Sequence, residues 1–194
     1  MVVEHQDIKQ INIQLLGSSQ QSLQYLIQKY CDNKLNHQQS SQNCQFIEYE
    51  KTNICVENKN KQVYFWNDFG FDHVEDKNLK LRLKNVHGVI FLYDINNYQH
   101  YLETCQRFFR VQILEELLKQ KFSKVIIGIQ QNQSEQRQVS NKEAQDFSLS
   151  TGAKLYELFQ FQQINFDESF NYLIQEILRI SNIEQKQKNQ SLQI

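Results

Sequence analysis

The stretch with the clearest chemical potential is Ile11–Tyr30, INIQLLGSSQQSLQYLIQKY. An apolar run, a glycine and then apolar residues at helical spacing predict a buried strand, a short turn at Gly17 and a helix. A strand, a glycine turn and a helix form the frame on which phosphate-binding loops are built. Whether phosphate can bind there depends on the side chains that the frame carries.

Cysteine and histidine, the other residue types with metal or nucleophile chemistry, are scattered along the chain. The four cysteines include no CxxC pair, which is typical of free thiols that mostly fill a core in a reducing compartment. The five histidines lack the spacing of a metal site, and no Ser/His/Asp arrangement is evident. We therefore expect no metal and no catalytic residue. The cysteines are Cys31, Cys44, Cys55 and Cys105.

Length and charge restrict the class of protein. The 194 residues are enough for one domain with a substantial core. A net charge of −1 does not favour binding to nucleic acid or to a membrane surface through bulk charge. The sequence shows no transmembrane run and no signal peptide. We therefore expect a soluble intracellular protein.

Apolar periodicity predicts strands that alternate with helices after one early hairpin. The predicted strands are Ile8–Leu16, Phe46–Val56, Gln62–Trp66, Val86–Asp94, Val125–Ile129 and Lys154–Phe159. The predicted helices are Ser22–Tyr30, Tyr98–Lys119, one with a Ser140/Glu143 capping box that ends at Gly152, and Asp167–Ile180. Leu79–Leu83 is at best a helical turn. The long helix is expected to bury Leu102, Cys105, Phe109, Ile113 and Leu117.

This order predicts a doubly wound α/β domain, with a six-stranded, mostly parallel sheet and helices on both faces. Its ligand crevice would lie beyond the carboxyl ends of the strands. We expect residues 1–7 to be an N-terminal extension, residues 8–180 to be the domain and residues 181–194 to be a polar, frayed tail. Glu57–Lys61 is predicted to be the hairpin turn, and Phe69–Asp76 an irregular connection.

Several motifs over residues 8–180 carry a family likeness. They are Leu15–Gly17, Phe65–Trp66, Gly88–Asp94, Arg137–Ser140 and Glu143–Gln145. Their order and spacing resemble Rab-type members of the Ras superfamily, which are small GTPases with a P-loop NTPase-like fold. The resemblance implies the doubly wound sheet and a nucleotide crevice at its carboxyl edge.

The phosphate-binding motif of that family, GxxxxGK[ST], is degraded in this chain. Only its first glycine remains; Leu23 replaces the lysine that meets the β- and γ-phosphates, and Gln24 replaces the hydroxyl that holds Mg²⁺. Gln20 and Ser22 stand at glycine positions, where a side chain penalises positive φ. The corresponding residues are Gly17, Ser18, Ser19, Gln20, Gln21, Ser22, Leu23 and Gln24.

The other nucleotide motifs of the family are altered as well. In place of DxxGQ, Asn67 lacks a carboxylate, which Asp68 could replace only in part, and Phe71 cannot orient a water. In place of the guanine-reading NKxD, an isoleucine and an amide stand at the first and last positions. No threonine lies near Gln42–Cys44, where switch I would carry one. The vestigial crevice thus also includes Asn67, Asp68, Gly70, Phe71, Ile129, Gln130 and Asn132.

These losses imply a pseudo-GTPase that binds no cofactor. A hydrogen bond to a charged group contributes about 1.5–3 kcal/mol, so losing about four weakens nucleotide binding by about 6 kcal/mol, roughly 10⁴-fold. The alternative is a divergent GTPase that still binds GTP or GDP with Mg²⁺ through backbone contacts and partner residues, and regulates intracellular or ciliary trafficking. Another small molecule in the crevice is a third reading. Leu23 either plugs the phosphate site or reflects drift, and Phe69 and Phe71 either fill the pocket or face a partner.

The resemblance also implies a partner surface. Rab-type proteins bind effectors through an aromatic patch, to which Tyr49, Trp66 and either Leu81 or Leu83 correspond by spacing. The alternative for Trp66 is a packed sheet residue. The C-terminal QKQKNQSLQI lacks the cysteines that are prenylated in Rab proteins, so no membrane anchor is expected. Unanchored Rab-like subunits of ciliary transport and axonemal complexes suggest a ciliary or cytoskeletal complex as the setting.

Overall fold

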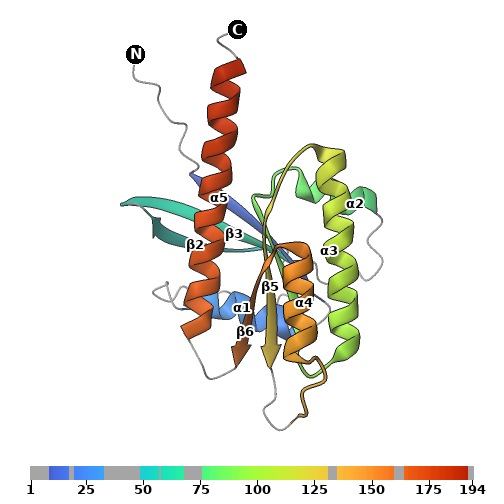
Figure 1. Cartoon of the computed structure of the whole chain (residues 1–194). Coiled ribbons are helices and arrows are strands. Elements are labelled where there is room, and N and C mark those ends of the chain that lie inside the picture. The colour runs from blue at the N-terminus through green and yellow to red at the C-terminus, as the bar shows by residue number, and fades with distance from the viewer. Residues whose placement is uncertain are drawn as a thin grey trace.

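The computed structural model describes residues 9–17, 20–32, 49–56, 58–67, 76–130, 135–159 and 164–191 (Figure 1). The strands are β1 (Gln10–Gly17), β2 (Tyr49–Val56), β3 (Lys59–Asn67), β4 (Gly88–Asp94), β5 (Ser123–Gln130) and β6 (Lys154–Phe159). The helices are α1 (Gln20–Asp32), α2 (Asp76–Leu83), α3 (Tyr98–Leu118), α4 (Asn141–Thr151) and α5 (Ile164–Ser191).

The strands form one six-stranded sheet in the order β2-β3-β1-β4-β5-β6. The β2–β3 hairpin is antiparallel, and every other neighbouring pair is parallel. The carboxyl ends of the parallel strands therefore meet at one edge of the sheet, which is where ligands bind in doubly wound folds. The prediction of a doubly wound, mostly parallel sheet is confirmed.

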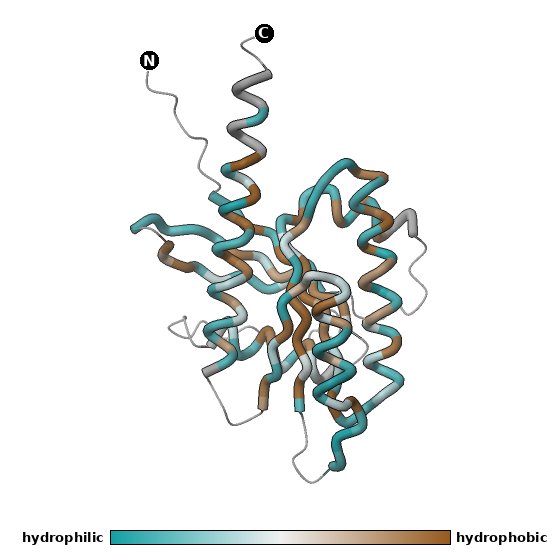
Figure 2. Tube along the Cα trace, in the orientation of Figure 1, coloured by the Kyte–Doolittle hydropathy of each residue, from teal (hydrophilic) through white to brown (hydrophobic). Residues whose placement is uncertain are grey.

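Helices cover both faces of the sheet and create two apolar cores. The first core joins the sheet to α1 and α5, and the second joins it to α2, α3 and α4. Every residue of β1 from Ile11 to Gly17 is buried, and the central strands are predominantly brown in the hydropathy view of Figure 2. A strand covered on both faces explains why β4 is almost continuously apolar.

The face that α3 buries differs from the predicted one. Four of the five residues expected to form its core stripe are exposed, including Phe109 at 51% and Ile113 at 63% of their surface, whereas Cys105 is half-buried against the second core. The buried face instead includes two polar residues whose side chains are satisfied: Thr104 Oγ1 donates to the carbonyl oxygen of Leu92, and the carboxylate of Glu115 accepts from the Phe122 N–H. The spacing of apolar residues predicted the wrong buried face of α3. The face that is buried includes polar residues, and these are tolerated there because they have buried hydrogen-bond partners.

Several element boundaries also differ from the prediction. α5 continues to Ser191, past the expected end at Ile180, since this polar segment is rich in helix-forming residues and contains no glycine or proline. α2 is a helix of 8 residues. β3 begins at Lys59, directly after Asn58, whose φ is 60°. Cys55 is exposed, so it does not fill the core.

The capping prediction for α4 is confirmed. Ser140 accepts from the Glu143 N–H and forms the full capping box with it, and Gly152 ends the helix with φ 70°. Among the helices in the described ranges, none is long and apolar enough to cross a membrane.

Candidate functional site

The carboxyl edge of the sheet brings together residues from three of the altered nucleotide motifs. Gly17 ends β1, Asn67 ends the neighbouring β3, and Ile129 lies near the end of β5. The strand registers stagger them along this edge: Leu15 pairs with Asn67, Gly17 pairs with Leu92, and Ile129 pairs with Asp94, so each lies about two residues further along the sheet than the one before. These three residues therefore all lie towards the carboxyl ends of their strands.

Two leucine side chains lie close to the backbone of Gly17. A Cβ added at Gly17 would lie 2.8 Å from the Leu92 Cβ and 3.6 Å from the Leu23 Cδ2. Leu23, at the position of the family's lysine, is 2% exposed and belongs to the first core, whereas its neighbour Gln24 is exposed. Ser22, also on α1, is fully buried.

A cation from α3 approaches the same strand end. Arg107 Nη1 donates a hydrogen bond of 2.6 Å to the carbonyl oxygen of Gly17. This contact ties α3 to the end of β1 across 90 residues of sequence. Sequence reasoning missed it, because an arginine in a helix carries no signal of the carbonyl oxygen that it will meet.

The other predicted residues of this edge that the structure describes carry no charge and are buried or half-buried. Ile129 is 1% exposed and lies in the first core, and Gln130 is half-buried. Asn67 is 5% exposed, and within the described part of the chain neither its Nδ2 nor its Oδ1 has a hydrogen-bond partner. An amide with both polar atoms unsatisfied is unusual in a protein interior.

Some predicted site residues fall outside the described residues. The structure describes Gln20 and Gln21 only as backbone of α1. The predicted site residues that lie outside the described residues are Ser18, Ser19, Asp68, Phe69, Gly70, Phe71 and Asn132.

The described residues of this edge do not fit a nucleoside triphosphate with Mg²⁺. Leu23 and Ile129 are apolar and buried, so neither can donate to a phosphate or read a base. Asn67 is an amide, so it supplies no carboxylate to support a cation at this position. Phosphate beside apolar side chains would lose hydration without compensation.

The predicted partner residues lie elsewhere, on the face of the sheet near β2 and β3. Tyr49 packs on Trp66 with ring centroids 5.1 Å apart and on Tyr64 at 5.8 Å. We call these three residues and Leu81 the sheet patch. Tyr49 is 46% and Leu81 61% exposed, whereas Leu83 is fully buried in the second core. Leu83 is therefore corrected from a candidate partner residue to a core residue.

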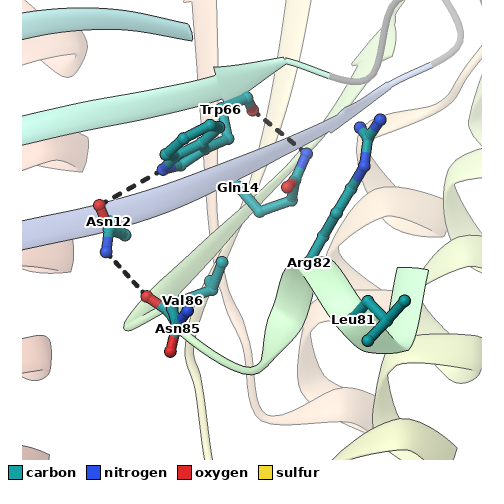
Figure 3. A pocket seen from close by; sticks show the side chains of 7 residues that line it. All are labelled: Asn12, Gln14, Trp66, Leu81, Arg82, Asn85 and Val86. Atoms are coloured by element: carbon teal, nitrogen blue, oxygen red, sulfur yellow. Dashed lines mark hydrogen bonds between the residues drawn. The ribbon is translucent and has the colours of Figure 1, made fainter. Parts of the chain in front are cut away.

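A cavity of about 260 Å³ adjoins the sheet patch (Figure 3). Trp66 and Leu81 of the sheet patch line it, and Figure 3 shows Gln14 between Trp66 and Arg82. The indole Nε1 of Trp66 donates to Asn12 Oδ1 over 3.3 Å, and Asn12 Nδ2 donates to the carbonyl oxygen of Asn85 over 2.9 Å. The remaining lining residue is Val86.

Sequence reasoning missed Asn12 and Gln14 as site residues. Both lie on β1, in the centre of the sheet, and they are only 9% and 1% exposed. Polar residues that alternate with apolar ones in a strand usually indicate that one face of the strand is exposed to solvent. Their position in a strand that was expected to be covered on both faces could have identified them, because a polar side chain in such a strand needs a buried hydrogen-bond partner.

Comparisons with known proteins agree with this fold. The model of the Ras family matches residues 12–179. Among curated proteins, the Ras-related protein Rab-15 of Mus musculus and that of Homo sapiens are each 22% identical to the chain over 168 residues, covering 85% of this chain and 75% of the relative. The chain therefore belongs to the Ras family, and it is Rab-like.

Proposed function

We propose that this Ras-family chain is a pseudo-GTPase: it uses the fold to bind proteins, and it neither binds nor hydrolyses GTP. The observation that carries the proposal is Leu23, which is 2% exposed where the family places its phosphate-binding lysine. The lysine, the Mg²⁺ hydroxyl and the guanine-reading aspartate are replaced together. One such loss could be compensated, but several around one edge remove most of the charge-assisted bonds to a nucleotide.

The sheet patch is the proposed partner surface. It offers exposed aromatic and aliphatic area at Tyr49 and Leu81, beside the half-buried Trp66. Aromatic side chains are enriched among residues that dominate binding energy at protein interfaces. Because no nucleotide would control this surface, we propose a stable place in a larger intracellular assembly instead of a signalling cycle.

Replacing Trp66 tests the proposed partner surface. Trp66→Ala removes the indole that stacks on Tyr49 and donates to Asn12, so we expect partner capture from a native lysate to fall about tenfold or more. Trp66→Phe is the matched control, since it keeps an aromatic ring and should retain most of the binding. Quantitative mass spectrometry of the co-purified proteins is the measurement. Unchanged recovery with a folded Trp66→Ala chain would remove the sheet patch from the proposal.

A ciliary or cytoskeletal complex is the setting that we propose for this assembly. The support is analogy with unanchored Rab-like subunits of ciliary transport and axonemal complexes. The proteins captured by the wild-type chain and lost with Trp66→Ala would identify the setting directly.

A divergent GTPase is the second candidate function. The observation in its favour is Asn67, whose two buried polar atoms would gain partners if a ligand or water bound at the edge. Such a protein would hold GTP or GDP with Mg²⁺ through backbone contacts and residues supplied by a partner, and would regulate intracellular or ciliary trafficking. The two candidates differ in one measurable property, the nucleotide that the purified protein carries.

A further inference from the structure

A chain of hydrogen bonds joins His87, just before β4, to Trp66 of the sheet patch. His87 Nδ1 accepts the N–H of Asn12 over 3.0 Å, and the His87 N–H donates to the Asn12 carbonyl oxygen over 2.8 Å. Asn12 Oδ1 in turn accepts the indole N–H of Trp66 over 3.3 Å (Figure 3). Asn12 therefore contacts the histidine through its backbone and the tryptophan through its side chain.

The imidazole of His87 takes the place of a backbone carbonyl oxygen as the acceptor for the Asn12 N–H. The pairing of β1 with β4 begins at Ile13 and Gly88, directly after this contact. A carbonyl oxygen accepts at every pH, whereas Nδ1 accepts only while it is unprotonated. Protonation turns Nδ1 into a donor that faces the Asn12 N–H, so the hydrogen bond is lost and the two donors repel each other.

Burial keeps the His87 ring unprotonated at neutral pH. The side chain is half-buried, and burial lowers the pKa of His87 below its ordinary value of about 6.5. Charged residues flank the points where His87 contacts the chain, and most of them are cations, which oppose a further positive charge. They are Lys9, Lys84, Lys121 with its partner Glu116, and Lys124 with its partner Glu115. Protonation is therefore expected in mildly acidic solution.

The segment that carries His87 also orients the side chain that holds Trp66. Asn12 Nδ2 donates over 2.9 Å to the carbonyl oxygen of Asn85, two residues before His87. The Trp66 indole packs on Tyr49 with ring centroids 5.1 Å apart and lines the cavity beside the sheet patch. A shift of this segment would therefore move the acceptor of the indole. A surface that must be reordered before it binds loses affinity.

We propose that His87 is a pH-sensitive switch for the sheet patch: when its ring is protonated, Asn12 and the Trp66 indole lose their fixed positions, and partner binding weakens. The effect on partner binding rests on the proposed function. The coupling of Trp66 to His87 belongs to the chain alone and can be measured without a partner.

Nuclear magnetic resonance on the full chain, titrated from about pH 7.5 to about pH 5, tests the coupling. Trp66 is the single tryptophan, so its indole N–H gives one identifiable signal. We expect this signal and the ring signals of His87 to move with one common midpoint below about pH 6.5. His87→Gln, whose amide oxygen accepts at every pH, should abolish the Trp66 transition, and the matched control His100→Gln on α3 should retain it. Circular dichroism at each pH verifies that the chain stays folded.

Three results would overturn the switch. The Trp66 signal could stay constant, or have a different midpoint, while His87 titrates. His87 could remain unprotonated down to about pH 5. The Trp66 transition could persist in a folded His87→Gln chain. If that variant does not fold, the two midpoints of the wild-type chain decide alone.

Partner capture at two pH values separates the switch from the proposed function. Capture by the wild-type chain should fall about threefold or more between about pH 7.5 and about pH 5, and capture by His87→Gln should fall less, because the variant loses no hydrogen bond to Asn12. Coupled midpoints without Trp66-dependent capture at any pH would refute the partner surface and leave the coupling intact. Trp66-dependent capture with uncoupled midpoints would refute only the switch.

Discussion

Gly17, the one glycine retained from the phosphate motif, has a structural role that requires no phosphate. It lies where β1 approaches β4, and a Cβ there would come within 2.8 Å of the Leu92 Cβ and 3.1 Å of the Leu92 carbonyl oxygen. Those distances are shorter than van der Waals contact, so a side chain would force the two strands apart. Close strand packing therefore explains why this glycine remains when the other glycine positions are filled.

Gly17→Ala should destabilise the domain by about 1–3 kcal/mol, because the added methyl group overpacks the contact with Leu92. Urea unfolding followed by circular dichroism measures the change. A loss below about 0.5 kcal/mol would mean that the strands move apart freely, and that the close approach does not explain the glycine.

His87 makes the stability of the chain depend on pH. Its Nδ1 accepts a hydrogen bond of 3.0 Å from the Asn12 N–H, which requires that nitrogen to be unprotonated, and burial lowers the pKa of His87. Protonation therefore favours the unfolded chain, whose histidine titrates near its ordinary pKa of about 6.5. The contribution is complete above that pH and is lost as the pH falls below it towards the lower pKa of the folded state.

The free energy of unfolding of the wild-type chain should therefore decrease between about pH 7.5 and pH 5.5 more steeply than that of His87→Gln. Urea titrations at several pH values give both curves. Parallel curves for the two proteins would show that His87 does not contribute to this dependence.

At the scale of elements, α1 packs apolar side chains into the first core from Leu23 onwards. Leu23 faces the first core together with Leu26 and Ile27, and all three are buried. An apolar residue at the lysine position thus extends the buried stripe of the helix by one residue towards Gly17. The burial favours the interpretation of Leu23 as a plug over drift without a role.

Leu23→Lys restores the family's residue and should fail to restore its function. We expect a loss of about 2–5 kcal/mol, since a buried ammonium replaces core packing, and no GTP-dependent stabilisation. Leu23→Met is the control and should cost less than about 1.5 kcal/mol. Thermal unfolding with and without GTP and Mg²⁺ measures both variants. A Leu23→Lys chain that is stable and gains stability from GTP would support a divergent GTPase instead.

Sequence patterns predicted the elements better than the faces they bury. The doubly wound sheet, the bounds of β6 and the capping box of α4 follow from local signals that one stretch of sequence contains in full. The buried face of α3 depends on distant partners, the Leu92 carbonyl oxygen for Thr104 and the Phe122 N–H for Glu115. The buried amide of Gln14 likewise depends on a distant partner, the carbonyl oxygen of Trp66. Such contacts between distant residues cannot be read from periodicity.

At the scale of the whole molecule, the pseudo-GTPase proposal separates the fold from the nucleotide chemistry. The Ras-family model covers residues 12–179, and the sheet order and both cores are complete in the described residues. The carboxyl edge carries buried apolar side chains at Leu23 and Ile129, and a cavity lined in part by Asn12 and Gln14 adjoins the sheet patch. This contrast supports the proposal that the molecule binds proteins through the sheet patch and does not bind nucleotide at its edge.

The nucleotide content of the purified protein tests the central claim most directly. The chain is purified under native conditions, denatured, and the supernatant is separated by anion-exchange chromatography, with an active Rab protein treated identically as the control. We predict that the control releases about one GDP or GTP per chain and that this protein releases none. Stoichiometric GDP or GTP from this protein would contradict the pseudo-GTPase account.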